Sequence, residues 1–402
     1  MADTAELRAE PRSSHIRIVA LVSAAHFVSH YYILILAPLL PFVRDAYNVS
    51  YTEIGLALAA FNVVTAALQT PAGFLVDWLG ARIILIIGLL IGAVAFTVVG
   101  LVDSFWVMVV MFGLAGVGNT VYHPADYAML SHHVPSERIG HAFSVHTFAG
   151  MMGSTAAPAG LLLMQSMWGW RAAFIGSGLL GLVVALVLIL VREGTPIPEA
   201  AKPKDDTDKS AGSWSLLLSG PILMNLLFFV LLAMISGGMF NYSVVALGVL
   251  HGTPPAVANT ALSSLLLTSA FGVLAGGVVA TRGKRHAMVA ALGLAGMAAM
   301  AVLIGQIDLG SVMLIAVMTV FGFFYGVIMP SRDMIVRDVT PPGSFGKVFG
   351  FITTGFNIGG IVSPLIFGAV MDHGNPRLVF AAVAAFALLS VLTVITLPRK
   401  AA

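Results

Sequence analysis

The sequence has no cysteine and very little charge. Without cysteine, the 402-residue chain can form neither disulfides nor thiolate metal sites. Only 9% of its residues are charged and 58% are hydrophobic, whereas soluble domains carry about 25% charged residues. This composition cannot cover a soluble surface, so it indicates an integral membrane protein. The formal net charge is +2 and no basic stretch favours nucleic acid, so we expect no nucleic-acid partner.

Two further features are missing from the sequence. Residues 1–15 are polar and of mixed charge, without the apolar core of a signal peptide, so we expect the first apolar segment to be retained. The chain also contains no Gly-x-x-x-x-Gly-Lys-Ser/Thr loop and no sizeable polar stretch that would bind a nucleotide. These absences predict a protein that uses neither ATP nor a bound cofactor.

What the sequence does contain is a series of apolar stretches. A helix that spans a bilayer needs about 20 largely apolar residues. Twelve stretches meet this requirement, and they predict an all-α integral membrane fold. The expected spans are 16–43, 53–76, 82–102, 105–130, 139–164, 171–191, 217–249, 256–280, 286–305, 310–336, 346–371 and 377–397.

The second half of the chain repeats the first. The segment from Gly116 to Pro158 returns in degenerate form 206 residues later. Glycines and prolines keep this offset, as in Gly116 with Gly322, Pro124 with Pro330, Pro135 with Pro341, Gly153 with Gly359 and Pro158 with Pro364. Such repeats are typical of membrane transporters. They predict two pseudo-symmetric six-helix bundles, 1–191 and 215–402, joined by a linker at 192–214.

Lysine and arginine predict the orientation of the chain. If both termini lie on one side, sixteen of the twenty basic residues fall on that side and three on the other. Positive residues collect on the cytoplasmic face of a membrane. We therefore expect cytoplasmic termini and a cytoplasmic linker in a multi-pass protein of the cell membrane, with the bacterial inner membrane as the expected location.

The segment between the second and third expected spans resembles a family motif. It reads GFLVDWLGAR and is similar to the loop motif G-x-x-x-D-R-x-G-R-[RK] of the major facilitator superfamily. Gly73, Asp77, Gly80 and Arg82 match the motif, and Trp78 replaces a base. With twelve spans, a six-plus-six repeat and a central linker, the resemblance covers nearly the whole chain. It implies the major facilitator fold, secondary active transport by alternating access, and a functional monomer in the lipid bilayer.

The same resemblance implies a gate at the cytoplasmic side. In the superfamily the acid and the base of this motif are thought to latch the outward-open state. We expect Asp77 to meet the inner end of the expected span 346–371 or a backbone N-terminus there. Arg138 and Lys347 either act as counterparts in two similar loops or are ordinary cytoplasmic charge. The predicted gate residues are Gly73, Asp77, Gly80, Arg82, Arg138 and Lys347.

The first half also resembles the fosmidomycin-resistance group of efflux proteins. The similar segments are HFVSH (26–30), SYTEIG (50–55), QTPAG (69–73) and GVGNTVYHP (116–124). That group tends to carry an acid soon after the first histidines and another just after His-Pro, where this chain has tyrosines and an alanine. The resemblance implies export of a small compound, and the departures leave the substrate and the coupling residues open.

Two of the expected spans, 105–130 and 310–336, carry charged residues that would lie inside the membrane. A charge at mid-bilayer costs about 2.5–3.5 kcal/mol on insertion scales, so Asp126, Arg332 and Asp333 need a role. Asp126 and Arg332 are equivalent by the 206-residue offset, and Pro124 and Pro330 predict helix kinks beside them. The two charges are predicted either to face one central cavity or to pair as a lock near the cytoplasmic end.

Polar side chains at helical spacing are expected to line that cavity. His26 and His30 are four residues apart, so they share one helix face as a proton relay, a metal pair or hydrogen-bonding groups. Two histidines alone hold a metal poorly, and we expect no metal site and no catalytic site. The predicted substrate and cavity residues are His26, His30, Asn119, Tyr122, His123, Tyr325, Arg332 and Asn357. The predicted proton-coupling residues are Asp126, Asp333, His123 and His30.

These residues support three hypotheses about function. The first is a secondary active transporter that exports a small, anionic or amphiphilic compound by coupling to protons, because an arginine such as Arg332 suits carboxylate or phosphonate groups. The second is proton-coupled uptake of an organic anion through the same residues. The third is a membrane enzyme, which is supported only by the pair His26 and His30. We do not expect the protein to be an enzyme. The expected partners are the lipid bilayer, a small-molecule substrate and protons.

Overall fold

The structure, a computed structural model, describes residues 12–191, 213–282, 285–341 and 345–395. Within these ranges the chain forms helices and connecting turns, without a strand. Twelve segments are helical, long and apolar enough to cross a membrane, and they lie within several residues of the expected spans. The prediction of an all-α membrane fold with twelve spans is therefore confirmed.

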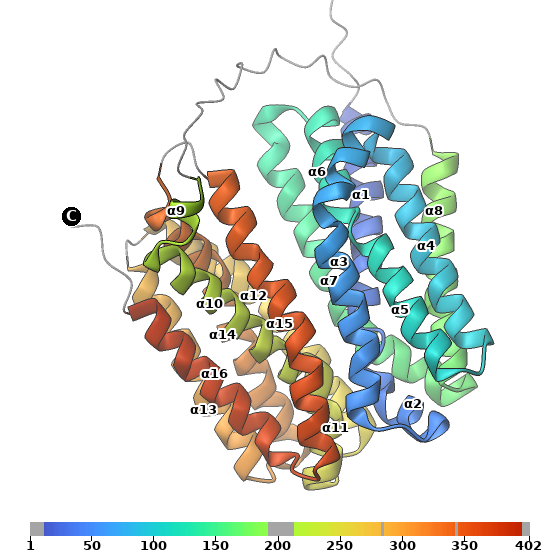
Figure 1. Ribbon diagram of the computed structural model, residues 1–402, viewed down its shortest axis with the longest axis vertical. Helices are drawn as coiled ribbons and strands as arrows, with labels where there is room; N and C mark the ends of the chain where they lie inside the picture. Colours follow the sequence, from blue (N-terminus) through green and yellow to red (C-terminus); the bar gives the residue numbers. More distant parts are fainter. Residues whose placement is uncertain (1–11, 192–212, 283–284, 342–344, 396–402) are drawn as a thin grey trace, which may run out of the picture.

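The first six spans form one half of the molecule, coloured blue to green in Figure 1 and called here the N half. The equivalent helices of the second set form the C half, coloured yellow-green to red. The N half contains α1 (Arg12–Ile33), η1 (Ala37–Leu39), α2 (Leu40–Tyr47), α3 (Tyr51–Leu79), α4 (Ala81–Leu101), α5 (Phe105–Asn119), α6 (Tyr122–His133), α7 (Ser136–Trp168) and α8 (Trp170–Leu190).

The C half repeats this order. It contains α9 (Ser213–Leu217), α10 (Gly220–Ser236), η2 (Gly237–Tyr242), α11 (Ser243–His251), α12 (Pro255–Arg282), α13 (His286–Gln306), α14 (Gly310–Val339), α15 (Phe345–Asp372) and α16 (Arg377–Ile395). The two halves lie side by side in Figure 1. We call the end where α8 ends and α9 begins the linker end, and the opposite end, with α2 and α11, the far end.

The first helix of each half is interrupted, although the sequence predicted continuous spans over 16–43 and 217–249. In the N half, α1 gives way to the 3-10 turn η1, where Pro38 lacks the N–H that a continuing α-helix needs. In the C half, α10 widens into the π-helical turn η2, which begins with two glycines. Hydropathy reports only the length of an apolar stretch, so these breaks could not be predicted from it.

The fourth membrane span is built differently in the two halves. In the N half it is broken at Thr120 and Val121, between α5 and α6 and just before Pro124. In the C half, α14 runs without a break from Gly310 to Val339 with Pro330 inside it. The same proline position therefore accompanies a broken helix in one half and a continuous helix in the other.

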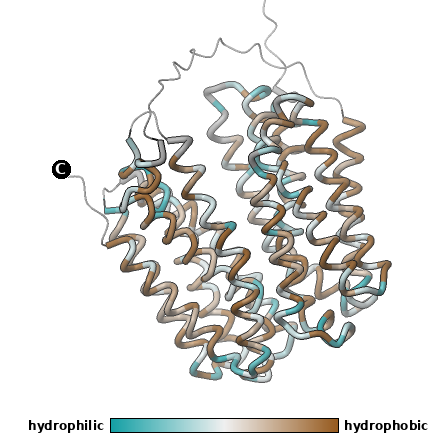
Figure 2. Tube along the Cα trace, in the orientation of Figure 1, coloured by the Kyte–Doolittle hydropathy of each residue, from teal (hydrophilic) through white to brown (hydrophobic). Residues whose placement is uncertain are grey.

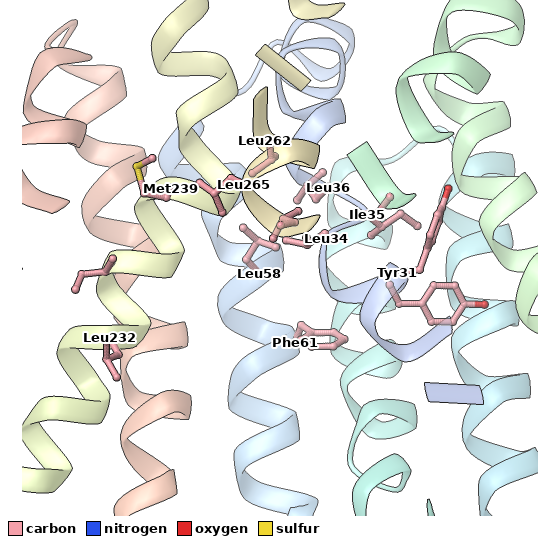
Figure 3. Close-up of a cluster of buried hydrophobic side chains, with 14 of the residues drawn as sticks. Tyr31, Leu34, Ile35, Leu36, Leu58, Phe61, Leu232, Met239, Leu262 and Leu265 are labelled. Atoms are coloured by element: carbon pink, nitrogen blue, oxygen red, sulfur yellow. The ribbon is translucent and has the colours of Figure 1, made fainter. Parts of the chain in front are cut away.

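The two halves share one buried apolar cluster toward the far end. Figure 3 shows the buried side chains of Leu34, Leu36 and Leu58 from the N half beside those of Leu262 and Leu265 from the C half. Helices within a membrane associate through van der Waals packing, since lipid is as apolar as these side chains, so the close packing of this cluster contributes to holding the halves together there.

Helices α3 and α15 contact each other at the far end and separate at the linker end. A side-chain carbon at Gly55 would lie 2.7 Å from the Pro364 carbonyl oxygen, which shows that the two backbones nearly touch. Toward the linker end, a side-chain carbon at Gly73 of α3 or at Gly350 of α15 would meet nothing within 4 Å. The side chain of Trp78 is 79% exposed there. The halves are thus closed against each other at the far end.

The surface of the helices is apolar along the expected membrane spans. Figure 2 shows hydrophobic residues along the lengths of the helices and hydrophilic ones gathered at the two ends. Large apolar side chains such as Val183 and Leu388 are more than half exposed. Exposure of this kind is unfavourable in water and is expected for side chains that face lipid.

Candidate functional site

A cluster of ionisable side chains lies in the N half, where three helices meet. His26 comes from α1, Asp126 from α6 and His146 from α7. The Nδ1 atom of His26 lies 3.1 Å from Oδ2 of Asp126, and Nε2 of His146 lies 3.7 Å from the same oxygen. All three residues are buried, and Asp126 is 0% exposed. A buried carboxylate is tolerated where it is paired or shares a proton, and the imidazoles provide that partner.

Two further histidines extend this cluster. The His26 ring centroid lies 4.7 Å from that of His30, 5.3 Å from that of His123 and 3.8 Å from that of His146. The Nδ1 atom of His30 lies 3.2 Å from the Ser154 hydroxyl oxygen. His123 is exposed whereas His26 is buried. The cluster therefore runs from the protein interior to an imidazole that is exposed at the protein surface.

A glycine on α7 makes room for the imidazoles. A side-chain carbon at Gly150 would lie 2.8 Å from Nε2 of His26 and 2.9 Å from Cδ2 of His30. Real side-chain carbons do not approach other atoms so closely, because interiors are packed at van der Waals contact. Only glycine at this position lets α7 approach α1 with both rings between them.

Several polar atoms of the cluster have no hydrogen-bond partner among the described residues. They include Oδ1 of Asp126 and both ring nitrogens of His146. Buried polar atoms without a partner are uncommon and call for an explanation such as a functional role or a bound water or ion. The arrangement is chemically suited to accept and pass on a proton, because a carboxylate and imidazoles lie within one another's reach.

The cluster also has the size of a metal site. One ligand atom each from His26, Asp126 and His146 lies within 4.8 Å of the others. The shortest distance, 3.1 Å between His26 and Asp126, is that of a hydrogen bond, so a shared proton accounts for this pair without a metal. The expectation of no metal site stays a prediction.

The charged group of the C half is a neighbouring pair on α14. The Nε atom of Arg332 donates a hydrogen bond of 2.9 Å to Oδ1 of Asp333, and NH2 lies 2.8 Å from the same oxygen. The guanidinium carbon lies 4.7 Å from the ring centroid of Phe229 and 5.2 Å from that of Phe356. The Arg332 side chain is 14% exposed and that of Asp333 is 49% exposed. The two rings hold the cation in place through cation–π contacts.

Asp126 and Arg332 have separate partners in this state. Asp126 is hydrogen-bonded to His26 of the N half, and Arg332 is paired with Asp333 of the C half. The pseudo-symmetric positions therefore carry opposite charges, each balanced within its own half.

The remaining predicted cavity residues lie in different surroundings. Tyr122 is buried, and its hydroxyl has no hydrogen-bond partner among the described residues. Asn119, the last residue of α5, and Asn357 on α15 are half-buried. The Tyr325 ring lies 5.3 Å from that of Phe240 in the C half. The sequence analysis thus grouped residues that the structure distributes over the core and the two halves.

Tyr127 is a residue of the site that the sequence analysis missed. It is 46% exposed, and its ring centroid lies 4.9 Å from that of Phe143 and 6.1 Å from that of His146. The signal was present in the sequence, because Tyr127 follows His123 by four residues and so shares its helix face.

The loop motif is described only in part. Gly80 ends α3 at φ 91°, a backbone conformation that favours glycine, and α4 begins directly after it. The Arg82 guanidinium donates hydrogen bonds to the carbonyl oxygens of Leu188 and of Val191, the latter at 2.6 Å. Arg138 is exposed. The side chains of Asp77 and Lys347 lie outside the described residues, so the expected cytoplasmic gate stays a prediction.

A sequence profile described as the Major Facilitator Superfamily matches residues 22–253 and 226–402 of the chain. The fosmidomycin resistance protein of Escherichia coli K12 is 22% identical over 384 residues, covering 94% of this chain and 92% of the relative. The multidrug resistance protein MdtH of Aeromonas salmonicida is 23% identical, covering 81% and 80%. A probable sulfoacetate transporter of Cupriavidus necator is 28% identical over 157 residues, which cover 39% of this chain and 36% of the relative.

Solved structures show a similar fold. A bacterial homolog of the human lysosomal transporter Spinster, in an inward-facing and unoccupied conformation, has a TM-score of 0.78 at 16% sequence identity, covering 96% of this chain and 95% of the other. The nucleoside transporter NupG has a TM-score of 0.77 at 15% identity, covering 95% and 100%. At these identities the likeness concerns the fold alone.

Proposed function

Because the chain belongs to the major facilitator superfamily of membrane transporters, we propose that it is a secondary active transporter that exports a small, anionic or amphiphilic compound in exchange for protons. The proposal places the protein in the cell membrane as a functional monomer. The linker end, where Arg17, Arg82, Arg138, Arg285 and Arg337 lie, would face the cytoplasm.

The buried Asp126–His26 hydrogen bond is the observation that carries the proposed proton coupling. The carboxylate is 0% exposed, and the imidazole cluster around it extends to the exposed His123. Burying a carboxylate in a membrane protein is costly, so such a group usually has a function. A proton that enters at His123 would reach Asp126 through His26 and neutralise it.

Arg332 supports an anionic group on the substrate. A guanidinium recognises carboxylate, sulfonate or phosphonate through two parallel charge-assisted hydrogen bonds. In this state Asp333 occupies two nitrogens of Arg332, so an anionic substrate would compete with that side chain. Phe229 and Phe356 beside the guanidinium offer apolar surface to an amphiphilic compound.

The arrangement of the halves supports alternating access. Helices α3 and α15 nearly touch at the far end and separate at the linker end. Rocking one six-helix bundle against the other would expose a site at their interface to each side in turn. The state described here would be open toward the cytoplasm, with Gly73, Asp77, Gly80, Arg82, Arg138 and Lys347 at the gate that closes in the opposite state.

Export is favoured over uptake by the names of two relatives that extend along most of the chain. These are the fosmidomycin resistance protein and MdtH, a multidrug resistance protein. The second candidate function is proton-coupled uptake of an organic anion. It is favoured by Arg332 and by the shorter match to a probable sulfoacetate transporter.

The test is proton flux across liposomes that contain the purified protein and an imposed pH gradient. Carboxylates, sulfonates, phosphonates and amphiphilic drugs would be added to one side at a time. We expect protons to move only when a transported compound is present, and in the direction opposite to that compound. Movement of both in the same direction would favour the uptake alternative. Compound transport without any proton movement would contradict the proposed coupling.

A further inference from the structure

We propose that Asp372 is a positioning residue of the transport cycle, a carboxylate of the C half that caps a helix of the N half and holds the far end closed. The inference rests on the alternating-access function proposed above. Asp372 is the last residue of α15, and α3 begins at Tyr51. Its two carboxylate oxygens would have to leave α3 before the far end could open.

The contact consists of three hydrogen bonds across the boundary between the halves. The Tyr51 N–H donates to Oδ1 of Asp372 at 2.7 Å, and the Thr52 N–H donates to Oδ2 at 2.8 Å. The Thr52 hydroxyl donates to the same Oδ2 at 2.5 Å. Hydrogen bonds to an ionised acceptor are about twice as strong as neutral ones, so one side chain supplies a strong link between the halves.

The start of α3 is incompletely capped by its own half. The first N–H groups of a helix have no partner within the helix. Ser50 and Glu53 form a reciprocal capping box, in which each side chain accepts the N–H of the other residue. The N–H groups of Tyr51 and Thr52 remain, and these are the two that Asp372 accepts. The negative carboxylate also suits the positive end of the helix dipole.

Close packing of α15 against the start of α3 positions this carboxylate. Gly368 lies one turn before Asp372, and a side-chain carbon there would lie 2.8 Å from both the Thr52 Cα and the Tyr51 carbonyl oxygen. Any larger residue would push the two helices apart. Close approach at Gly368 therefore places Asp372 directly over the first turn of α3.

The contact is made at only one of two equivalent interfaces. The 206-residue offset places Ser166 of α7 at the position equivalent to Asp372. The Ser166 hydroxyl donates to the carbonyl of Leu163 in its own helix. The carboxylate is therefore a specific feature of the α3–α15 interface and is absent from the repeat position in the sequence.

The experiment uses the absence of cysteine from the chain, because introduced cysteines then carry spin labels without background. The pair W106C/V312C reports on the far end, and H132C/D338C reports on the linker end. All four positions are exposed, and each pair is related by the 206-residue offset. Distance distributions by pulsed electron paramagnetic resonance would be recorded for the full chain in lipid nanodiscs, with and without Asp372→Asn.

We expect Asp372→Asn to raise the ratio of far-end-open to far-end-closed molecules by roughly tenfold, because an amide accepts fewer and weaker hydrogen bonds than a carboxylate. The linker-end distances should shorten at the same time. Thr52→Val, which removes only the hydroxyl donor, should move both distances in the same directions by a smaller amount.

The matched control is Asp308→Asn. Asp308 also accepts an N–H at the far end, from Gly310 at the start of α14, but both partners belong to the C half. This variant should leave both distance distributions unchanged. Unchanged distributions in both Asp372→Asn and Thr52→Val would overturn the inference while leaving the proposed function intact. If transport itself never alters the distances in the unsubstituted labelled protein, alternating access would fail instead.

Discussion

The two halves share one helix arrangement but carry opposite chemistry. The N half contains a fully buried carboxylate, Asp126, among imidazoles, and its fourth helix is broken before Pro124. At the equivalent position the C half contains the cation Arg332, which lies on the unbroken helix α14 and contacts two aromatic rings. Under the proposed function, the N half would bind the proton and the C half would bind the anionic group of the substrate.

This difference teaches how a duplicated fold can couple two ligands. A pseudo-two-fold axis places equivalent residues of the halves on opposite sides of a shared interface. If both halves carried the same groups, they would bind the same ligand twice. Under the proposed function, opposite charges at one repeat position would let each half bind its own ligand, and rocking of the halves would link the two binding events.

The largest effect is expected from a substitution of Asp126 in the N half. Asp126→Asn removes the carboxylate and keeps its shape, so the proton of the proposed exchange would lose its final acceptor, the buried carboxylate of the N half. We expect proton flux in liposomes to fall to the level of protein-free liposomes, while binding of the transported compound persists. Asp103→Asn alters an exposed carboxylate paired with Arg171 and should leave the flux unchanged. Flux at the full rate in Asp126→Asn would remove this residue from coupling.

A smaller effect is expected from crowding the imidazoles without changing any charge. Gly150→Ala would force a carbon against His26 and His30. Overpacking costs about 1–3 kcal/mol, which would lower transport by roughly tenfold if it falls on the site. Gly277→Ala is the matched control, because a side-chain carbon there would meet nothing within 4 Å. Equal transport in the two folded variants would show that the position of the rings does not matter.

The C half should respond through substrate affinity. Arg332→Lys keeps the charge and loses the two-pronged geometry. Loss of a charge-assisted hydrogen bond costs about 1.5–3 kcal/mol, so KM for an anionic compound should rise by about 10- to 100-fold with little change in kcat. Arg171→Lys, at an exposed ion pair, serves as the control. An unchanged KM would mean that Arg332 has a structural role in the C half and does not bind substrate.

The fold was largely predictable from the sequence because membrane spans have a strong signal. A bilayer requires long apolar helices, so hydropathy alone located all twelve. The repeat could be recognised in the sequence because glycines and prolines occupy equivalent positions in the two halves, where helices pack closely. The interruptions at η1 and η2 were not predictable, since they change neither length nor hydropathy.

The residues of the candidate site could be selected from the sequence, but the contacts between them could not. Asp126 and His26 were identified because buried polar residues are rare in membrane helices. Their hydrogen bond was not foreseen, because it joins α1 to α6 across 100 positions of sequence. Asp372 was not noticed as a cap, since a carboxylate at the end of an apolar stretch looks like ordinary surface charge. Pairing across the chain depends on helix packing, which a single sequence does not report.

The hydrogen bonds of Arg82 have a mechanical consequence. They join the start of α4 to the carbonyl oxygens at the end of α8, from which the chain continues toward the C half. The last carbonyl groups of a helix lack partners within the helix, and two of those at the end of α8 accept hydrogen bonds from Arg82 instead. The end of α8 and the start of α4 are therefore fastened to each other at the linker end.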